Sequence, residues 1–203
     1  MVSERVRTRL APAARRDQIL DVAARLIVEE GLQAATMERL ARVAGISKAL
    51  VYNYFATRDA LLGALLQREQ AELGDRGMGA ALRAGSFPEL IAQTTRLYLE
   101  HVRDRGPLIA ALLGDPATAA LMMAESQVGR DQTVRYFVRA ARRAYGLPLT
   151  RAIAAVDMLM AVTDQAGKLV ARGDLDLDAA LDMCLQIILG GLGRLADQPS
   201  ERL

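Results

Sequence analysis

The stretch from Thr36 to Leu62 constrains the fold of this chain more than any other part of the sequence. Thr36 is a favourable helix N-cap, and Glu38 follows in the first turn, where a negative charge suits the helix dipole. Gly45 predicts the end of this short helix, because glycine readily adopts the left-handed conformation of a helix stop. Ser47 offers a second N-cap two residues later. The spacing predicts two short helices that meet at a sharp turn, a helix-turn-helix.

The second of these predicted helices, over 48–54, has an unusual outward face. With Leu50 or Val51 facing inward, the outer positions carry one Lys, one Ala, one Asn and two Tyr, and no acid occurs between Ser47 and Arg58. A solvated helix usually carries Glu, Lys and Gln, whereas hydroxyl, amide and ammonium groups suit a groove lined with phosphates. We expect this helix to read double-stranded DNA; the alternative is a compact helical corner held by aromatic packing. The residues predicted to contact DNA are Arg15, Arg16, Thr36, Ser47, Lys48, Ala49, Tyr52, Asn53, Tyr54 and Arg58.

Basic residues are concentrated in the same part of the chain. Residues 1–58 hold ten Arg or Lys against six acidic residues, whereas residues 59–203 hold sixteen against eighteen. Such an excess of positive charge attracts the phosphate backbone of DNA whatever its base sequence. The leader, residues 1–10, fits either a phosphate-contacting arm or a solvated tail. The basic residues of the leader are Arg5, Arg7 and Arg9, and Arg15 and Arg16 follow a few residues later.

The helix-turn-helix and its surroundings resemble the N-terminal DNA-binding region of TetR-type transcriptional regulators. The resemblance covers about residues 15–66, and its motifs are a long first helix stopped at Gly31, the segment 44–47, the segment 51–55 and the helix start 57–59. It implies a homodimeric, usually repressing regulator with an all-helical C-terminal domain that binds a small molecule. Ala49 stands where many members have Gly or Pro, and Asn53-Tyr54 where a Tyr-x-His-Phe pattern is common. These departures bear on the DNA sequence that is read rather than on the fold.

The rest of the chain predicts helices only. We expect them over 12–30, 58–73, 87–105, 107–113, 116–145, 150–172 and 177–195, with a glycine-rich linker over 74–79. The predicted fold is all-α, an N-terminal three-helix helix-turn-helix module followed by a helical regulatory and dimerisation domain. The expected domains are residues 1–58, which bind DNA, and residues 59–203, which bind a ligand and form the dimer.

The last two predicted helices are apolar around most of their circumference. A helix of this kind must be buried on two sides, which predicts packing on its own domain and on a second copy across a two-fold axis. The alternative is that both helices lie in the interior of a monomer. The residues predicted at the dimer interface are Leu159, Leu169, Leu185, Leu189 and Leu192.

Apolar side chains with a few polar ones recur on three helices of the second domain and predict a small-molecule cavity. A hydrophobic or aromatic effector suits such a lining. For His101 a structural role in the core is the alternative to ligand contact. The residues predicted to contact the ligand are Leu97, Tyr98, His101, Phe137, Met158, Val162 and Gln165.

Other functional classes have little support in the sequence. One Cys and one His occur, far apart, and no nucleophile motif or phosphate loop is present, so we expect no catalytic residue, metal or cofactor. Asp174, Asp176 and Asp178 resemble a calcium loop only at its start and are interpreted as helix-start residues. No run of about 18 apolar residues occurs, which favours a cytoplasmic protein without a membrane partner.

Three functional hypotheses follow. The first is a homodimeric repressor that a hydrophobic effector releases from a palindromic operator. The second is a DNA-binding regulator without a small-molecule effector, which a filled core would favour. The third is a helical enzyme or carrier whose N-terminal module no longer binds DNA.

Overall fold

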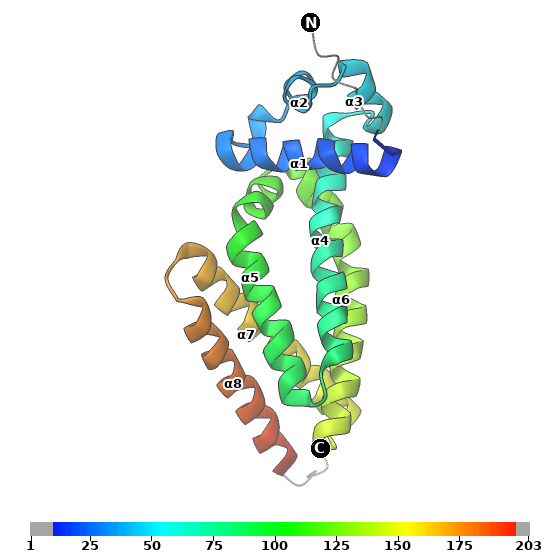
Figure 1. The fold of residues 1–203 in the computed structure, drawn as a ribbon. Helices are drawn as coiled ribbons and strands as arrows, with labels where there is room; N and C mark the ends of the chain where they lie inside the picture. Colours follow the sequence, from blue (N-terminus) through cyan, green and yellow to red (C-terminus); the bar gives the residue numbers. More distant parts are fainter. Residues whose placement is uncertain (1–9, 198–203) are drawn as a thin grey trace, which may run out of the picture. The chain divides into compact units, whose positions relative to one another are not determined.

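The computed structural model describes residues 10–197, with side chains for all of them except residues 121–130. Most of the described residues are helical and none lies in a strand, which confirms the predicted all-α class (Figure 1). They form two compact units. Of the described residues, the first unit holds residues 10–67 and Leu108–Ala119, and the second holds Arg68–Pro107 and residues 120–197. The leader arginines Arg5, Arg7 and Arg9 lie outside the described residues.

The first unit contains the predicted helix-turn-helix. Its elements are α1 (Pro12–Glu30), the short 3-10 helix η1 (Leu32–Ala34), α2 (Met37–Ala44), α3 (Lys48–Tyr54) and the beginning of α4 (Arg58–Arg83). Helix α2 packs on both α1 and α3. The buried core of this unit includes Ile19, Leu20, Leu40, Val51, Phe55 and Leu61. Val51, rather than Leu50, is therefore the inward residue of α3.

The helix boundaries here are set by the predicted caps. The hydroxyl oxygens of Thr36, Ser47 and Thr57 accept hydrogen bonds from the backbone N–H groups three residues later, at 3.2, 3.2 and 3.1 Å. Gly45 adopts the left-handed conformation, with φ 66° and ψ 33°, and ends α2. Each cap satisfies a backbone donor that the helix itself cannot, which explains why two helices of eight and seven residues are stable here.

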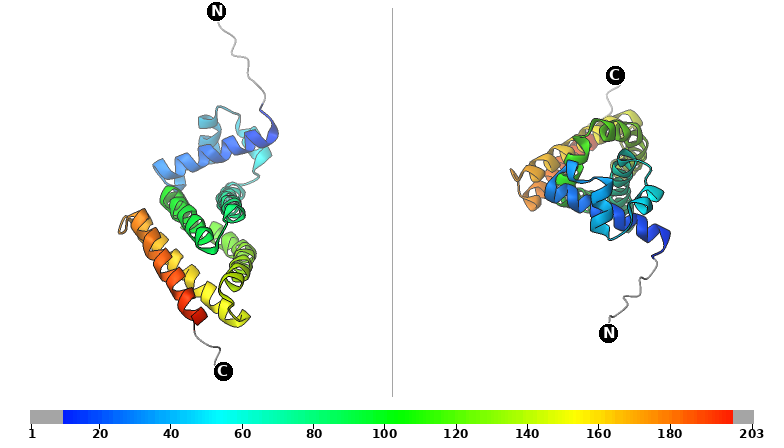
Figure 2. Two further views of the ribbon diagram at one scale, coloured as in Figure 1. Left: turned by 60° about the horizontal axis from the view of Figure 1, so that its bottom comes forward. Right: turned by 90° about the horizontal axis from the view of Figure 1, so that it is seen from above.

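The second unit is built from four long helices and the second part of α4. They are α5 (Phe87–Leu113), α6 (Pro116–Tyr145), α7 (Leu149–Arg172) and α8 (Leu177–Asp197), except that the end of α5 and the start of α6 belong to the first unit. Helices α7 and α8 lie side by side in an antiparallel pair (Figure 2). Between them Gly173 has φ 74°, and the Asp176 carboxylate accepts hydrogen bonds from the N–H groups of Asp178 and Ala179. The structure thus confirms Asp176 as a helix-start residue.

Two predicted helix breaks were wrong. Helix α4 continues through the glycine-rich stretch to Arg83, and α5 runs through Gly106 and Pro107 as one helix. A glycine in a helix costs only about 1 kcal/mol relative to alanine, and a proline removes one hydrogen bond. Packing along the whole helix can offset such local penalties.

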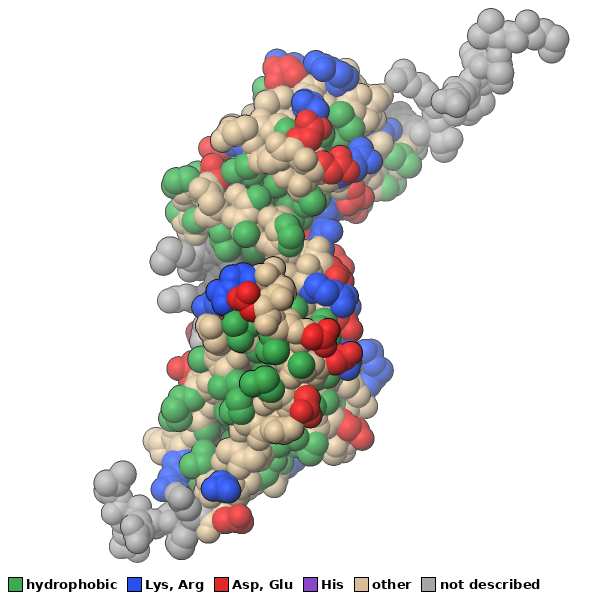
Figure 3. All heavy atoms as spheres, turned by 90° about the vertical axis from the view of Figure 1, so that its left-hand side faces the viewer, with side chains coloured by type: hydrophobic (Ala, Val, Ile, Leu, Met, Phe, Trp, Pro, Cys, Tyr) green, Lys and Arg blue, Asp and Glu red, His purple; other side chains and the backbone are tan. Residues whose placement is uncertain are grey.

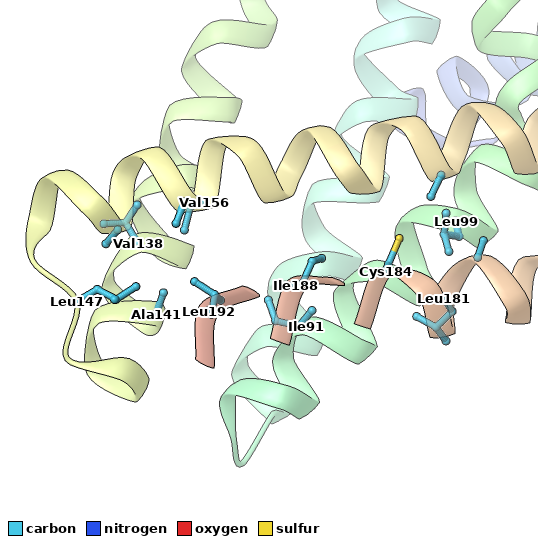
Figure 4. Close-up of a cluster of buried hydrophobic side chains, with 14 of the residues drawn as sticks. Ile91, Leu99, Val138, Ala141, Leu147, Val156, Leu181, Cys184, Ile188 and Leu192 are labelled. Atoms are coloured by element: carbon cyan, nitrogen blue, oxygen red, sulfur yellow. The ribbon is translucent and has the colours of Figure 1, made fainter. Parts of the chain in front are cut away.

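The core of the second unit lies between α5, α6, α7 and α8. Figure 4 shows Val138, Val156, Ile188 and Leu192 pointing into this common interior, with Ile91 beside them. Cys184 is buried in the same cluster, and its burial raises the pKa of the thiol. Within residues 10–197, α8 alone has the length and mean hydropathy, 1.4, of a possible membrane span. Its inner side, however, packs in this core.

Candidate functional site

Helix α3 presents the polar face that the sequence predicts. Lys48, Ala49, Tyr52 and Asn53 are exposed, and Tyr52 keeps 41% of its surface accessible. Tyr54 is half-buried. The exposed side chains offer an ammonium group, a phenol and an amide on one side of a seven-residue helix. Such groups can contact both phosphate oxygens and base edges in a major groove.

The two N-cap hydroxyls lie at the beginnings of α2 and α3. In each case the oxygen accepts a backbone hydrogen bond, as described above, so the hydroxyl hydrogen stays available as a donor. Thr36 and Ser47 are both exposed. The predicted phosphate contact of these residues is therefore compatible with their capping role, and both roles depend on the same hydroxyl group.

Lys48 has two partners within the helix-turn-helix. Its ammonium group forms a salt bridge with Glu38 on α2 and lies 5.8 Å from the centre of the Tyr52 ring. The hydrogen bond between the two side chains raises the pKa of Lys48 and lowers the pKa of Glu38. Both side chains are exposed. Lys48 must exchange Glu38 for a phosphate or guanine if it contacts DNA.

Three predicted arginines differ in how the structure holds them. Arg15 donates to the Gln18 amide oxygen at 2.5 Å, and the Arg16 guanidinium lies 5.3 Å from the centre of the Phe55 ring. Arg58 instead donates to the backbone oxygens of Ala35 and Leu32, at 3.2 and 2.8 Å. The structure thus gives Arg58 an internal role, because it holds the segment between α1 and α2.

The second unit contains a cavity of about 470 Å³ between its helices. The predicted residues Leu97, Tyr98 and Phe137 line it. Exposed residues of α4, including Met78 at 50% exposure, mark its open side. The volume lies within the range of about 300–1,000 Å³ that small-molecule sites occupy.

Four of the residues predicted to contact a ligand do not line this cavity. Met158 and Gln165 are exposed on the outer side of α7, Val162 is half-buried away from the lining, and His101 is buried elsewhere. Helix α7 is apolar on several faces, so its sequence does not reveal which face turns inward. The lining residues that sequence reasoning missed on this helix are Val156, Leu159, Met160, Thr163 and Asp164.

His101 belongs to a separate buried ionic cluster. Glu69 is fully buried and accepts two hydrogen bonds from the Arg105 guanidinium, at 2.6 and 2.5 Å. Burial lowers the pKa of His101, while the carboxylates of Glu69 and Glu72 act in the opposite direction. Its burial outside the cavity lining is consistent with the structural role that the sequence left as the alternative for His101. No cluster of His, Cys, Asp and Glu suited to a metal ion occurs within the described part of the chain.

The predicted dimer residues turn out to face mainly inward. Leu192 is buried, and both Leu192 and Leu159 line the cavity. Leu185 and Leu189 are half-buried against the core, and Leu169 is half-buried on α7. A different apolar set is exposed on α7 and α8. Figure 3 shows hydrophobic side chains gathered on the face to which α8 contributes. The exposed set is Leu149, Ile153, Met158, Met183 and Ile187.

Comparison with known proteins places the N-terminal region in a described family. Residues 19–65 match the family of bacterial regulatory proteins called the tetR family. The transcriptional regulator BetI of Rhizobium meliloti is 38% identical over 74 residues, which cover 36% of this chain. The chain therefore spans only about a third of that relative, 36% of its length.

Two further matches extend over most of the chain. The transcriptional activator FasR of Mycolicibacterium smegmatis is 28% identical over 204 residues, covering 92% of this chain and 87% of that protein. The crystal structure of a TetR-like transcriptional regulator from Rhodococcus has a TM-score of 0.71 and 23% identity. It covers 91% of this chain and 98% of the other. The structural match shows that both units share their fold with such a regulator.

Proposed function

We propose that this chain, which belongs to the TetR family of bacterial regulatory proteins, is a homodimeric, sequence-specific transcriptional regulator acting on DNA in the cytoplasm. In this proposal α3 enters the major groove, and two copies of the chain read the two halves of a palindromic operator. A hydrophobic small molecule in the cavity of the second unit lowers operator affinity. Where the operator overlaps a promoter, the chain acts as a repressor.

The outer face of α3 is the observation that carries this proposal. Its exposed Lys48, Tyr52 and Asn53 have the donors and acceptors that phosphates and base edges need. Core packing does not require these side chains, since Val51 and Phe55 fill the interior on the other side. Arg15 and Arg16 at the beginning of α1, with Thr36 and Ser47 at the caps, add further groups for phosphate contact.

The cavity favours a regulator with an effector over one without. A filled core in the second unit would have supported the alternative, but a space of about 470 Å³ remains between its helices. An effector changes operator affinity only if it binds the DNA-competent and released states with different affinities. Effector release therefore has to be measured with the operator present.

Selection of bound fragments from a random DNA pool tests the DNA-binding part of the proposal. We expect a palindromic consensus sequence. Tyr52→Ala and Lys48→Ala should each weaken binding to it by about tenfold or more, the usual effect of losing a specific base or charged contact. Arg139→Ala removes an exposed positive charge from α6 and is the matched control. Absence of any enriched sequence, or unchanged affinity in both α3 variants, contradicts the proposal.

A reporter gene fused to a promoter that carries the selected operator distinguishes repression from activation. A repressor lowers reporter expression, and the effector restores it. FasR, a relative that aligns over most of the chain, is named an activator. Increased reporter expression in the presence of the chain would overturn the proposed repression and leave the proposed DNA binding intact.

A further inference from the structure

The polar groups around the cavity include one carboxylate and several hydroxyl groups, beside the amide of Gln70. Asp164 on α7 is the only charged residue in the described lining. It is half-buried, and no described Lys or Arg forms an ion pair with it. A carboxylate among Leu, Ile, Val and aromatic side chains is unfavourable unless a positive charge or hydrogen-bond donors compensate it. The cavity therefore holds an incompletely compensated negative charge inside an apolar wall.

Three hydroxyl groups of the lining direct their hydrogens toward the protein backbone. Thr94 donates to the backbone oxygen of Leu90 at 2.7 Å, and Thr163 donates to that of Leu159 at 3.4 Å. Tyr136 donates to the backbone oxygen of Ala81 at 3.3 Å. Since each hydroxyl has a single hydrogen, only oxygen lone pairs are left for a ligand. These three groups thus accept hydrogen bonds from the cavity and do not donate into it.

Tyr98 completes this pattern beside Asp164. Burial, the Asp164 charge and a hydrogen bond to that carboxylate raise the pKa of Tyr98. The phenol thus remains protonated and donates to Asp164, whose other lone pairs stay available. Gly167, one turn beyond Asp164 on α7, makes this position possible. A Cβ atom there would lie 2.8 Å from the Tyr98 ring.

The aromatic rings of the lining add to the preference for positive charge. Tyr98, Tyr136 and Phe137 all line the cavity, and Tyr136 and Phe137 meet edge to face with their centres 5.9 Å apart. Ring faces attract cations through their quadrupole, and the attraction is stronger where water is excluded. A carboxylate ligand would find neither a basic residue among the described lining nor a hydroxyl donor in these four groups.

We propose that the cavity binds a hydrophobic cation, an amine or quaternary ammonium compound with an aromatic or alkyl body, whose positive charge lies at Asp164. This inference rests on the proposed function in one respect, since it takes the cavity to be the site where the effector binds. It narrows the chemistry of that effector. The apolar body of the ligand packs against the apolar lining, and its positively charged group pairs with Asp164 and makes cation–π contacts with the aromatic rings. Acidic ligands such as fatty acids are expected to bind more weakly, because no basic residue occurs in the described lining.

Three probes with one body and different heads test this proposal: 6-phenylhexylamine, 6-phenylhexanol and 6-phenylhexanoate. Binding to the full chain without DNA is measured by calorimetry at pH 7. We expect the amine to bind about tenfold or more tightly than the alcohol, and the carboxylate to bind most weakly. Equal affinities, tightest binding of the carboxylate, or no binding of the amine overturns the proposal.

Substitution of Asp164 separates its charge from its shape. Asp164→Asn keeps an oxygen that accepts from Tyr98 and should reduce amine affinity to that of the alcohol, whose own affinity changes little. Asp157→Asn removes an exposed carboxylate from the same helix, outside the lining, and should retain the preference. Retained amine preference in Asp164→Asn refutes the assigned counter-charge.

Operator release is then measured with the same amine. Amine binding that depends on Asp164 but leaves operator affinity unchanged supports the ligand class and contradicts the effector role. Release by the alcohol or carboxylate, with weaker release by the amine, supports the effector role and contradicts the ligand class. The two proposals can therefore fail independently.

Discussion

At the scale of single residues, Lys48 forms a salt bridge with Glu38 of α2 in the structure without DNA. The Glu38 carboxylate competes with a phosphate for the same ammonium group. We predict that Glu38→Gln increases operator affinity several-fold at low salt, because Lys48 no longer has to exchange an acidic partner. Fluorescence anisotropy over a series of salt concentrations measures this effect. Glu29→Gln removes an exposed carboxylate from α1 and is the control for loss of negative charge alone. An equal increase of operator affinity in both variants would contradict a special role of the salt bridge between Lys48 and Glu38.

His101 gives the second unit a dependence of stability on pH. Its pKa is lowered in the folded chain, mainly by burial, so between the folded value and the unfolded value of about 6.5 the unfolded chain binds a proton that the folded chain does not. Stability is therefore expected to fall as pH decreases from 7.5 to 5.5. The facing charged groups are the carboxylates of Glu69 and Glu72 and the guanidinium groups of Arg76 and Arg105.

Urea unfolding at the two pH values measures this contribution. His101→Gln should flatten the difference between the two midpoints, since His101 is the only histidine in the sequence. The ion pair of Glu69 and Arg105 serves as a reference: Glu69→Gln weakens the two hydrogen bonds from Arg105, whose side chain is 37% exposed, and should destabilise the chain at both pH values by about 2 kcal/mol. An unchanged pH difference in His101→Gln would contradict the titration of this residue.

At the scale of helices, the glycines of α4 combine low helix propensity with a place in the cavity wall. Gly74 and Gly77 line the cavity, and an added Cβ would meet nothing within 4 Å at either position. We predict that Gly74→Ala and Gly77→Ala each stabilise the chain by about 0.5–1 kcal/mol, because alanine loses less backbone entropy in a helix. Thermal unfolding measures the change. Gly173→Ala, where φ is 74°, should destabilise instead; destabilisation at Gly74 and Gly77 would mean that α4 needs their flexibility.

The helices also show which features the sequence could predict. Caps and short helices of the first unit were predictable, because Thr36, Gly45 and Ser47 act on neighbouring backbone groups. The continuity of α4 and α5 was not, since it depends on packing that outweighs local glycine and proline penalties. The inward face of α7 was not predictable either, because apolar residues occupy several of its faces. The internal hydrogen bonds of Arg58 were not predictable, because its acceptors lie more than twenty residues away in the sequence.

At the scale of the whole molecule, the exposed apolar set on α7 and α8 is where a second copy is expected to pack. Met183 and Ile187 lie one turn apart on α8, at 52% and 48% exposure, and Ile153 on α7 is 46% exposed. Side chains of this kind gain about 25 cal/mol for each Å² of apolar surface that an interface buries. A two-fold arrangement brings the same face from both copies together, so one substitution acts twice.

We predict that the double variant Met183→Glu with Ile187→Glu is monomeric, because four carboxylates would then face one another across the two-fold axis. Analytical ultracentrifugation gives the oligomeric state, and circular dichroism shows whether the helices are retained. Gln186→Glu adds one exposed charge on the same helix between them and should remain dimeric. A folded monomer should bind the full palindrome at least tenfold more weakly than the parent chain does. It should bind the palindrome no more tightly than it binds an isolated half-site, because the advantage of two linked recognition helices is lost.

A folded variant that remains dimeric would exclude this face as the interface. A monomer with undiminished affinity would show that one α3 suffices for operator recognition.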